Sequence, residues 1–294
     1  MHDVASIFHR YEAIRHRLPS AVRAKSSMFI ASLIEIVDEI DAFVFDAFGV
    51  LNVGETPIPG AAQRLEELRH LGVQIRILSN AASYSHDHAV QKFRDLGIQI
   101  DSEEIITSRD AALKDLDDRL WGCIAADADH LEDIGKDTIK LSDQAKDYDN
   151  VDGFLFLSSE SWTPEYQFIL RDSLLRKPRP LIIANADIAA PRDYGFSLEP
   201  GHFGHLLADD GIEDIKFYGK PFPEVFEMIE KSLPSISTSR IAMCGDTLHT
   251  DILGAAARNW RTVLVERDGM FAGVDTVGYR TNAGLDSTWR LSRI

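Results

Sequence analysis

Four groups of polar residues each follow directly after an apolar run in this 294-residue sequence. They are Asp46, the pair Ser79-Asn80, Lys220, and Asp246 with Asp251. If the four runs are strands of one parallel sheet, their carboxyl ends share one edge, and the polar groups converge there. Two carboxylates held close together repel each other, and a hard divalent cation such as Mg²⁺ relieves that repulsion. The sequence therefore predicts one polar site that binds a divalent cation between Asp46 and Asp246.

The runs that must position these groups have the length and composition of strands, and helical patterns separate them. We expect strands at 41–46, 73–78, 123–126, 153–157, 180–184, 214–218, 240–244 and 262–265. We expect helices after Pro59-Gly60 and at 86–96, 164–176, 223–232 and 251–258. Strands that alternate with helices are typical of a parallel sheet covered on both faces. The predicted fold class is α/β, a doubly wound, Rossmann-like parallel sheet.

The chain divides into three predicted parts. Residues 1–40 form a helical extension, because Ile7, Tyr11, Ile14 and Leu18 recur at helical spacing and a second apolar stretch, Met28–Ile40, follows. Residues 41–84 and 216–294 carry the four polar groups and form the core domain. Residues 85–215 are long enough to be an inserted domain with strands of its own.

Composition excludes several classes of protein. The chain has 31 Lys and Arg residues against 47 Asp and Glu, a net charge of −16, so a nucleic acid is a poor partner. No run is long and apolar enough for a membrane span, and the start lacks a basic region followed by an apolar run. Two cysteines, Cys123 and Cys244, are too few for a disulfide framework or a cysteine zinc site, and we expect both to be small buried residues. A cytoplasmic location is the expectation.

The four polar groups lie in motifs that resemble those of the haloacid dehalogenase superfamily. The motifs are Phe-Asp-Ala-Phe-Gly-Val-Leu at 45–51, Ser-Asn at 79–80, Gly-Lys-Pro at 219–221 and Gly-Asp-Thr-Leu-His-Thr-Asp at 245–251. The resemblance covers about residues 41–266. The last motif, continued by Ile-Leu-Gly-Ala, and the long insert resemble the class IIA cap group, which contains nitrophenyl-phosphatase-like and sugar-phosphate phosphatases. The insert would then be a cap over the site.

The resemblance implies a role for each motif residue. Asp46 would attack phosphorus and form an aspartyl-phosphate. Mg²⁺ would bind to Asp46, to Asp246 and to the backbone carbonyl of Phe48, with Asp251 supporting it from a second layer or through water. Ser79, Asn80 and Lys220 would bind the phosphoryl oxygens. The resemblance therefore implies a Mg²⁺-dependent phosphohydrolase that acts on a small phosphorylated metabolite.

Position 48 departs from the family pattern. Phosphatases of the superfamily have Asp-x-Asp-Gly where this chain has Asp-Ala-Phe-Gly, so Phe48 replaces the carboxylate that protonates the leaving group and activates water. Loss of such an acid typically slows hydrolysis by 10² to 10⁴-fold. Three hypotheses accommodate Phe48: a phosphatase that is slow or takes its acid from the cap, a dehalogenase, whose halide leaves without a proton, and a regulatory protein that binds a phosphorylated ligand. Retention of the metal carboxylate Asp246 argues against the dehalogenase.

The predicted cap carries the remaining candidates. Asn-Ala-Asp at 185–187 follows a predicted strand and is similar to the Asn-Pro-Asp of the class IIA group, so Asn185 and Asp187 are expected to face the substrate. Candidates for an acid borrowed from the cap are Asp187 and the histidines His86, His88, His202 and His205. By resemblance alone, the protein is expected to form a homodimer through the cap.

Overall fold

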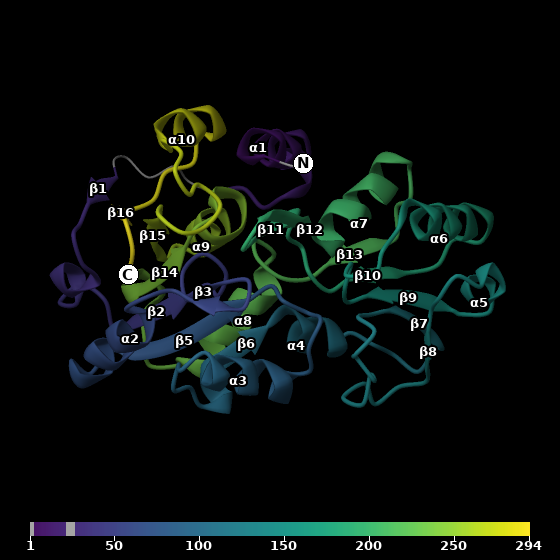
Figure 1. Cartoon of the computed structure of the whole chain (residues 1–294), viewed down its shortest axis with the longest axis horizontal. Coiled ribbons are helices and arrows are strands. Elements are labelled where there is room, and N and C mark those ends of the chain that lie inside the picture. Colours follow the sequence, from purple (N-terminus) through teal and green to yellow (C-terminus); the bar gives the residue numbers. More distant parts are fainter. Residues whose placement is uncertain (1–2, 22–26) are drawn as a thin grey trace.

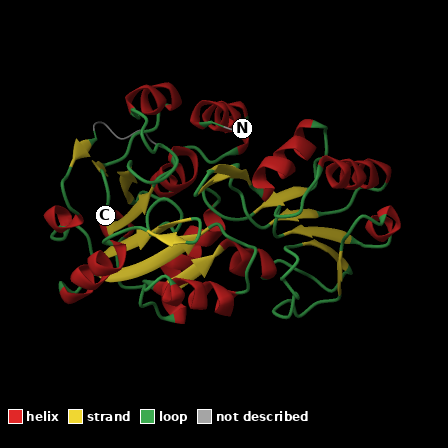
Figure 2. Cartoon of the chain, viewed as in Figure 1, coloured by secondary structure: helices red, strands yellow, loops and turns green. Residues whose placement is uncertain are grey.

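Two parallel sheets organise the chain, which a computed structural model describes over residues 3–21 and 27–294. Figure 1 places the larger sheet and its helices at the left and the smaller sheet at the right. Figure 2 shows that helices flank both sheets. Among the described residues, no helix combines the length and the apolar character that a bilayer crossing requires.

The larger sheet has seven parallel strands. Their order is β1 (Met28–Phe29), β16 (Trp289–Leu291), β15 (Arg261–Val265), β14 (Ile241–Gly245), β2 (Ala42–Phe45), β5 (Gln74–Ser79) and β6 (Ile105–Thr107). On β2, Phe45 lies opposite Cys244 of β14 and Ile77 of β5. This register brings the residues that follow β2, β5 and β14 to one edge of the sheet.

Side chains of β2 alternate between two hydrophobic clusters, as a strand covered on both faces requires. Phe43 and Phe45 pack in the cluster that contains residues of α2 (Ala61–His70) and α3 (His86–Asp95). Ala42 and Val44 pack on the opposite side with residues of three other helices, which are α4 (Ser108–Leu113), α8 (Pro223–Ser232) and α9 (Leu253–Ala257). The predicted doubly wound α/β fold is confirmed.

The smaller sheet has five parallel strands. Their order is β13 (Ile215–Phe217), β10 (Leu181–Ile183), β9 (Gly153–Phe156), β7 (Trp121–Ile124) and β8 (Thr138–Lys140). Phe154 and Phe156 pack with residues of α5 (Ala145–Asp149), α6 (Pro164–Arg176) and α7 (Pro200–Asp209). Leu155, from the other face, lies in the same cluster as α8 of the larger sheet, so one apolar core joins the two sheets.

The remaining elements are short pairs, turns and two helices. They are β3 (Asn52–Val53) with β4 (Thr56–Pro57), β11 (Ala189–Arg192) with β12 (Gly195–Leu198), α1 (Val4–Ala13), α10 (Val277–Ala283), and η1 (Arg15–Arg17), η2 (Leu33–Ile36), η3 (Ser102–Glu104), η4 (Thr238–Arg240) and η5 (Leu248–Ile252).

The N-terminal extension is only partly helical. Helix α1 begins after Asp3, whose side chain caps it, and buries Ile7 and Tyr11 as the spacing predicts. The prediction of further helix at 28–40 is wrong. This segment contains strand β1, which pairs with β16, and the short turn η2. Pairing with a strand near the other end of the chain overrides the local apolar pattern.

The boundaries expected for the inserted domain also differ from the sheet membership. Strand β6 pairs with β5 in the larger sheet, so the segment after residue 85 first continues that sheet. Strand β13, at the far end of the insert, pairs with β10 in the smaller sheet. The smaller sheet therefore runs from Trp121 to Phe217, because strand pairing, which local periodicity does not reveal, decides which sheet a segment joins.

Candidate active site

The structure brings the predicted polar groups together at the carboxyl edge of the larger sheet. Asp46 follows β2, Asp246 follows β14, and Asp251 lies on η5. One carboxylate oxygen from each of these three residues lies within 4.8 Å of the other two. All three are buried, as are Ser79, Asn80 and Lys220. The convergence predicted from parallel strand ends is therefore found in the fold.

Lys220 lies between two of these carboxylates. Its Nζ is 2.5 Å from Asp46 Oδ1 and 2.8 Å from Asp251 Oδ1. Burial by itself would lower the pKa of Lys220, but the nearby carboxylates of Asp251, Asp46 and Asp187 raise it instead. The ammonium group therefore stays charged at the centre of the site.

Backbone groups fix the orientation of Asp246 and Asp251. Met270 N donates to Asp246 Oδ2 over 2.6 Å, and Thr247 N donates to Asp251 Oδ2 over 3.0 Å. Gly49 has a φ of +80° and lies against Asp246, so any side chain at position 49 would overlap that carboxylate. The turn after β2 thus needs glycine for its conformation and for its close approach.

Without a further cation, burial and mutual repulsion disfavour the ionised form of these carboxyl groups. Burial raises the pKa of Asp46 well above its usual range, and Asp251 and Asp246 add to the rise while Lys220 opposes it. Burial and the neighbouring Asp251 raise the pKa of Asp246 to about 7. In the described part of the site, Lys220 is the one cation facing Asp46, Asp187, Asp246 and Asp251.

This donor set fits a hard divalent cation. Carboxylate oxygens are preferred ligands of Mg²⁺, and a double positive charge compensates for the excess of buried carboxylates over lysine. Asp251 Oδ1 is buried and, apart from its ion pair with Lys220, takes no hydrogen bond from a described residue. Of the predicted ligand set, Asp46, Asp246 and Asp251 lie together, and Phe48 is two residues after Asp46.

Asn80 connects Lys220 to the smaller sheet. Its Oδ1 accepts a hydrogen bond of 2.7 Å from Lys220 N, and its Nδ2 donates to Lys220 O over 3.0 Å. The same Nδ2 donates to Asp187 Oδ1 over 2.8 Å. Ser79, the preceding residue, has an Oγ that accepts a hydrogen bond from Ala81 N. Asp187 thus lies beside the buried cluster, although it follows β10 of the smaller sheet.

Asn185 hydrogen-bonds to Glu199 and Asp187 rather than to Asp46, Asp246, Asp251 or Lys220. Its Nδ2 donates to Glu199 Oε2 over 3.2 Å, and its Oδ1 accepts from Asp187 N over 2.9 Å. Asn185 therefore supports the turn that positions Asp187.

A cavity of about 1140 Å³ adjoins the cluster and contains Phe48, Ala81, Asn185 and Asp187 in its lining. Its lining contains Phe48, two residues after Asp46, but not Asp46 itself. Both sheets contribute to its wall, so it lies where a substrate would enter.

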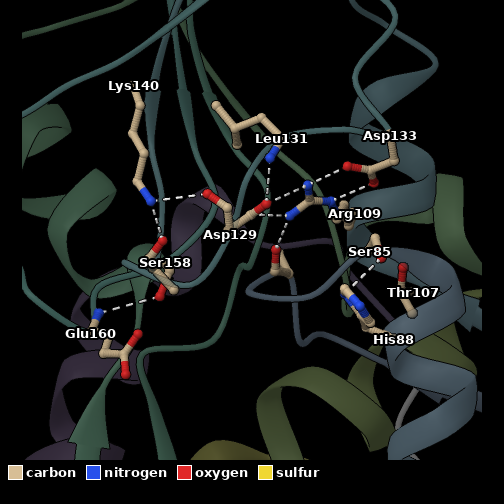
Figure 3. Close-up of polar contacts among 12 residues, drawn as sticks. Ser85, His88, Thr107, Arg109, Asp129, Leu131, Asp133, Lys140, Ser158 and Glu160 are labelled. Carbon is tan, nitrogen blue, oxygen red and sulfur yellow. Dashed lines mark hydrogen bonds and ion pairs between the residues drawn. The ribbon is translucent and has the colours of Figure 1, made fainter.

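Part of the cavity wall depends on Arg109, which the sequence analysis missed. Its fully buried guanidinium forms ion pairs with Asp129 and Asp133, as Figure 3 shows, and donates to Ala82 O over 3.0 Å. An arginine on a helix looks like any solvated residue in sequence, so no local signal distinguishes it.

Tyr11, which the sequence predicts only as an apolar helix position, also contacts the site. Its hydroxyl oxygen accepts a hydrogen bond of 3.1 Å from Ile188 N, next to Asp187. Its ring stacks on His249, with 4.9 Å between the ring centres, and His249 pairs with Glu12. Figure 1 shows α1 above the junction of the two sheets, and Arg10 and Arg17 also pair with Asp209 of α7. The N-terminal helix therefore joins the two sheets near the site.

Comparisons with known proteins agree with this architecture. Residues 43–126 match a family model described as haloacid dehalogenase-like hydrolase, and residues 217–284 match one described as HAD-hydrolase-like. The chain is 26% identical to the 4-nitrophenylphosphatase of Schizosaccharomyces pombe, over 76% of this chain and 83% of that protein. It is 25% identical to an acid sugar phosphatase of Staphylococcus haemolyticus, over 81% of this chain and 84% of that protein.

The fold is also that of a solved structure. A possible sugar phosphatase from Cytophaga hutchinsonii superposes with a TM-score of 0.80 at 23% identity, covering 91% of this chain and 98% of that one. The two matched segments contain all four polar groups, and the sheet order and the clustered carboxylates agree with the match. The resemblance expected from the motifs is confirmed: the chain belongs to the haloacid dehalogenase-like hydrolases, and the proteins it is similar to include nitrophenyl and sugar phosphatases.

Proposed function

We propose that this protein is a phosphohydrolase that transfers the phosphoryl group of a small phosphate ester to Asp46 and then to water. The observation that carries the proposal is the position of Lys220, whose ammonium contacts Asp46 and Asp251 while Asp246 lies within the same group of oxygens. An anionic nucleophile approaches a phosphoryl group only where positive charge offsets the repulsion. The similarity to a 4-nitrophenylphosphatase and an acid sugar phosphatase supports the same activity.

Asp46 is the proposed nucleophile. Its Oδ1 is held by Lys220 Nζ and by Ala47 N, which donates over 2.7 Å. Both contacts orient the carboxylate and stabilise its ionised form. A carboxylate oxygen of Asp46 would form a bond to phosphorus as the ester P–O bond breaks, and water would then hydrolyse the aspartyl-phosphate to inorganic phosphate.

Mg²⁺ is the proposed cofactor. Asp46, Asp246 and the backbone carbonyl of Phe48 would hold it, with Asp251 supporting it through water or from a second layer. When bound, the ion would supply the charge that screens the phosphoryl oxygens. Lys220 and Ser79 would bind those oxygens. Asn80, expected from the motif to bind them too, instead uses its side-chain amide on Lys220 and Asp187 and would hold Lys220 in place. The smaller sheet would act as the cap over the cavity.

The cavity favours substrates whose leaving group carries no negative charge. The lysine and the arginine in its lining already form ion pairs, Lys92 with Glu55 and Arg192 with Glu199. Acidic lining residues without an ion pair to any described residue are Asp87, Asp95, Glu132, Glu160 and Asp187. An anionic leaving group would be repelled there. Sugar phosphates and polyol phosphates are therefore the proposed substrate class.

Hydrolysis of a panel of phosphate esters tests the proposal. Wild-type protein and the variants Asp46→Asn and Asp38→Asn would be incubated with 4-nitrophenyl phosphate, glucose 6-phosphate and glycerol 3-phosphate, with Mg²⁺ or with a chelator. Asp38 is exposed and serves as the matched control. We expect turnover in wild type and Asp38→Asn, and none in Asp46→Asn or with chelator.

Two outcomes would favour the other hypotheses. A wild-type protein that hydrolyses no ester but is stabilised against heat by inorganic phosphate and Mg²⁺ is a phospho-ligand binder. Halide release from a haloacid without metal would indicate a dehalogenase, against which the buried carboxylates Asp246 and Asp251 argue.

A further inference from the structure

The proposed reaction lacks a proton donor at the usual position. Phe48 occupies the place two residues after Asp46, and a phenyl ring neither donates nor accepts a proton. An alcohol leaves from phosphorus as a poor alkoxide unless a positioned acid protonates it. An acid for this step must therefore come from elsewhere in the cavity that Phe48 lines.

Asp187 lies in this cavity and is held firmly. Its Oδ1 accepts a hydrogen bond of 2.8 Å from Asn80 Nδ2, and its own N donates to Asn185 Oδ1. The adjacent Ile188 N donates to the buried hydroxyl of Tyr11. Two contacts from other segments, Asn80 and Tyr11, and one within the turn thus fix it, while Asp187 Oδ2 takes no hydrogen bond from the part of the chain that the structure describes. One oxygen of the carboxyl group remains available to a substrate.

The surroundings of Asp187 favour its protonated form. Burial raises its pKa to about 8. The carboxylates of Asp46 and Asp251 add to the rise, whereas the charge of Lys220 and the hydrogen bond from Asn80 oppose it. Tyr11, which is buried beside Asp187 and whose own pKa is raised by burial, brings no charge. A carboxyl group in this setting carries a proton near neutral pH.

Two histidines of the cavity, His86 and His88, are less well placed. His86 uses both ring nitrogens, one with Asp110 and one with Ser102, and His88 bonds Ser85. None of these contacts reaches the buried cluster. Asp187, in contrast, is one hydrogen bond from Asn80, which itself holds Lys220.

We infer that Asp187, which follows β10 of the smaller sheet, acts as the general acid and base that position 48 no longer supplies. The inference rests on the proposed phosphatase function. In the first step, the Asp187 carboxyl gives its proton to the ester oxygen as the P–O bond breaks and the Asp46–phosphorus bond forms. In the second step, the Asp187 carboxylate takes a proton from water as the water oxygen bonds to phosphorus and the Asp46–phosphorus bond breaks. Asp187 ends protonated, so the cycle closes with one alcohol and one inorganic phosphate.

Leaving-group dependence tests this role. Asp187→Asn keeps the shape of the side chain and an oxygen for Asn80, but it has no carboxyl proton. We expect kcat/KM for glycerol 3-phosphate to fall by about 10²-fold or more. 4-Nitrophenyl phosphate, whose phenolate leaves with little need of a proton, should fall far less. Asp193→Asn, an exposed carboxylate on the β11–β12 turn, is the matched control and should leave both rates unchanged.

A second variant separates proton transfer from structure. In the Asp187→Asn background, Phe48→Asp returns a carboxyl group to the usual position. The double variant should hydrolyse glycerol 3-phosphate at least about tenfold faster than Asp187→Asn does. Equal losses on both esters in Asp187→Asn, without recovery, would assign Asp187 a structural role and overturn the inference.

The remaining outcomes distinguish this inference from the proposed function. Turnover of the aryl ester with no effect of Asp187→Asn on the alkyl ester would overturn the role of Asp187 alone. The same holds for a wild type that hydrolyses only the aryl ester. No turnover of either ester would overturn the phosphatase proposal and this role with it.

Discussion

The guanidinium of Arg192 lies over the ring of Phe48, with 5.0 Å from its carbon to the ring centre. Lys92 Nζ lies 5.4 Å from the same centre, so two cations face the aromatic ring. Each such contact is worth about 0.5–1 kcal/mol when exposed. Phe48 also packs against the apolar cluster beneath β2. Position 48 is therefore built around a ring, and a carboxylate placed there would meet both cations.

Phe48→Asp alone should raise glycerol 3-phosphate hydrolysis by no more than about tenfold. Asp187 already supplies the proton in wild type, so a second carboxyl group at position 48 has little rate left to gain. Steady-state kinetics at saturating Mg²⁺ would measure the gain. Phe48→Leu, which adds no acid, should show none. A gain above a hundredfold would mean that wild type has no acid at all.

The stability of the metal-free protein should fall as the pH rises from about 5 to about 8. The pKa of Asp187 is about 8 in the fold against 3.8 in its ordinary state. The folded state therefore binds more protons than the unfolded state across this window, and its free energy of unfolding falls with rising pH. Asp246, with a pKa of about 7, acts in the same direction. Urea denaturation with chelator should give a smaller fall for Asp187→Asn than for wild type, and equal falls would contradict the raised pKa.

Arg109→Met should lower the free energy of unfolding by about 3–5 kcal/mol. The guanidinium is fully buried, and its removal leaves the carboxylates of Asp129 and Asp133 without a counter-charge beside the cavity. Arg176→Met is the control, because Arg176 forms an exposed ion pair with Asp149 and should change stability little. Chemical denaturation of the three proteins would measure the difference. Similar values for both variants would show that the buried network is not stabilising.

Tyr11→Phe should cost about 1–3 kcal/mol of stability, because it leaves the buried Ile188 N without an acceptor. The same loss should loosen the turn that carries Asp187 and lower kcat for glycerol 3-phosphate. Tyr194→Phe is the matched control, since Tyr194 is 99% exposed. Thermal and kinetic measurements on both variants would check this. Unchanged stability in Tyr11→Phe would argue against a link between α1 and the smaller sheet.

Phosphoglycolate should be a poorer substrate than glycerol 3-phosphate, with KM raised at low ionic strength. Its carboxylate would enter a cavity lined by unpaired acids such as Glu132 and Glu160. Added salt should reduce the difference, because it screens the repulsion. Comparable KM values at every salt concentration would remove charge as the basis of selection.

The sequence alone determined the fold class and the location of the polar cluster. Asp46, Asn80, Lys220 and Asp246 each follow an apolar run, and strand ends in a parallel sheet share one edge whatever the details of packing. That rule depends on local pattern and chain order, both of which are visible in the sequence. The same reasoning identified Phe48 as a departure from the family motif, because a residue type is visible without coordinates.

Only the tertiary structure decided how distant segments meet. The apolar stretch from Met28 became strand β1 because β16, some 260 residues later, offers it a partner. Arg109 and Tyr11 gained their roles from Asp133 and Ile188, which lie in other elements. Hydrogen bonds and ion pairs act over a few ångströms, and a single sequence does not reveal which distant groups come within that range. For that reason, the sequence suggested Asp187 only as one of five acids, and the bond to Asn80 singled it out.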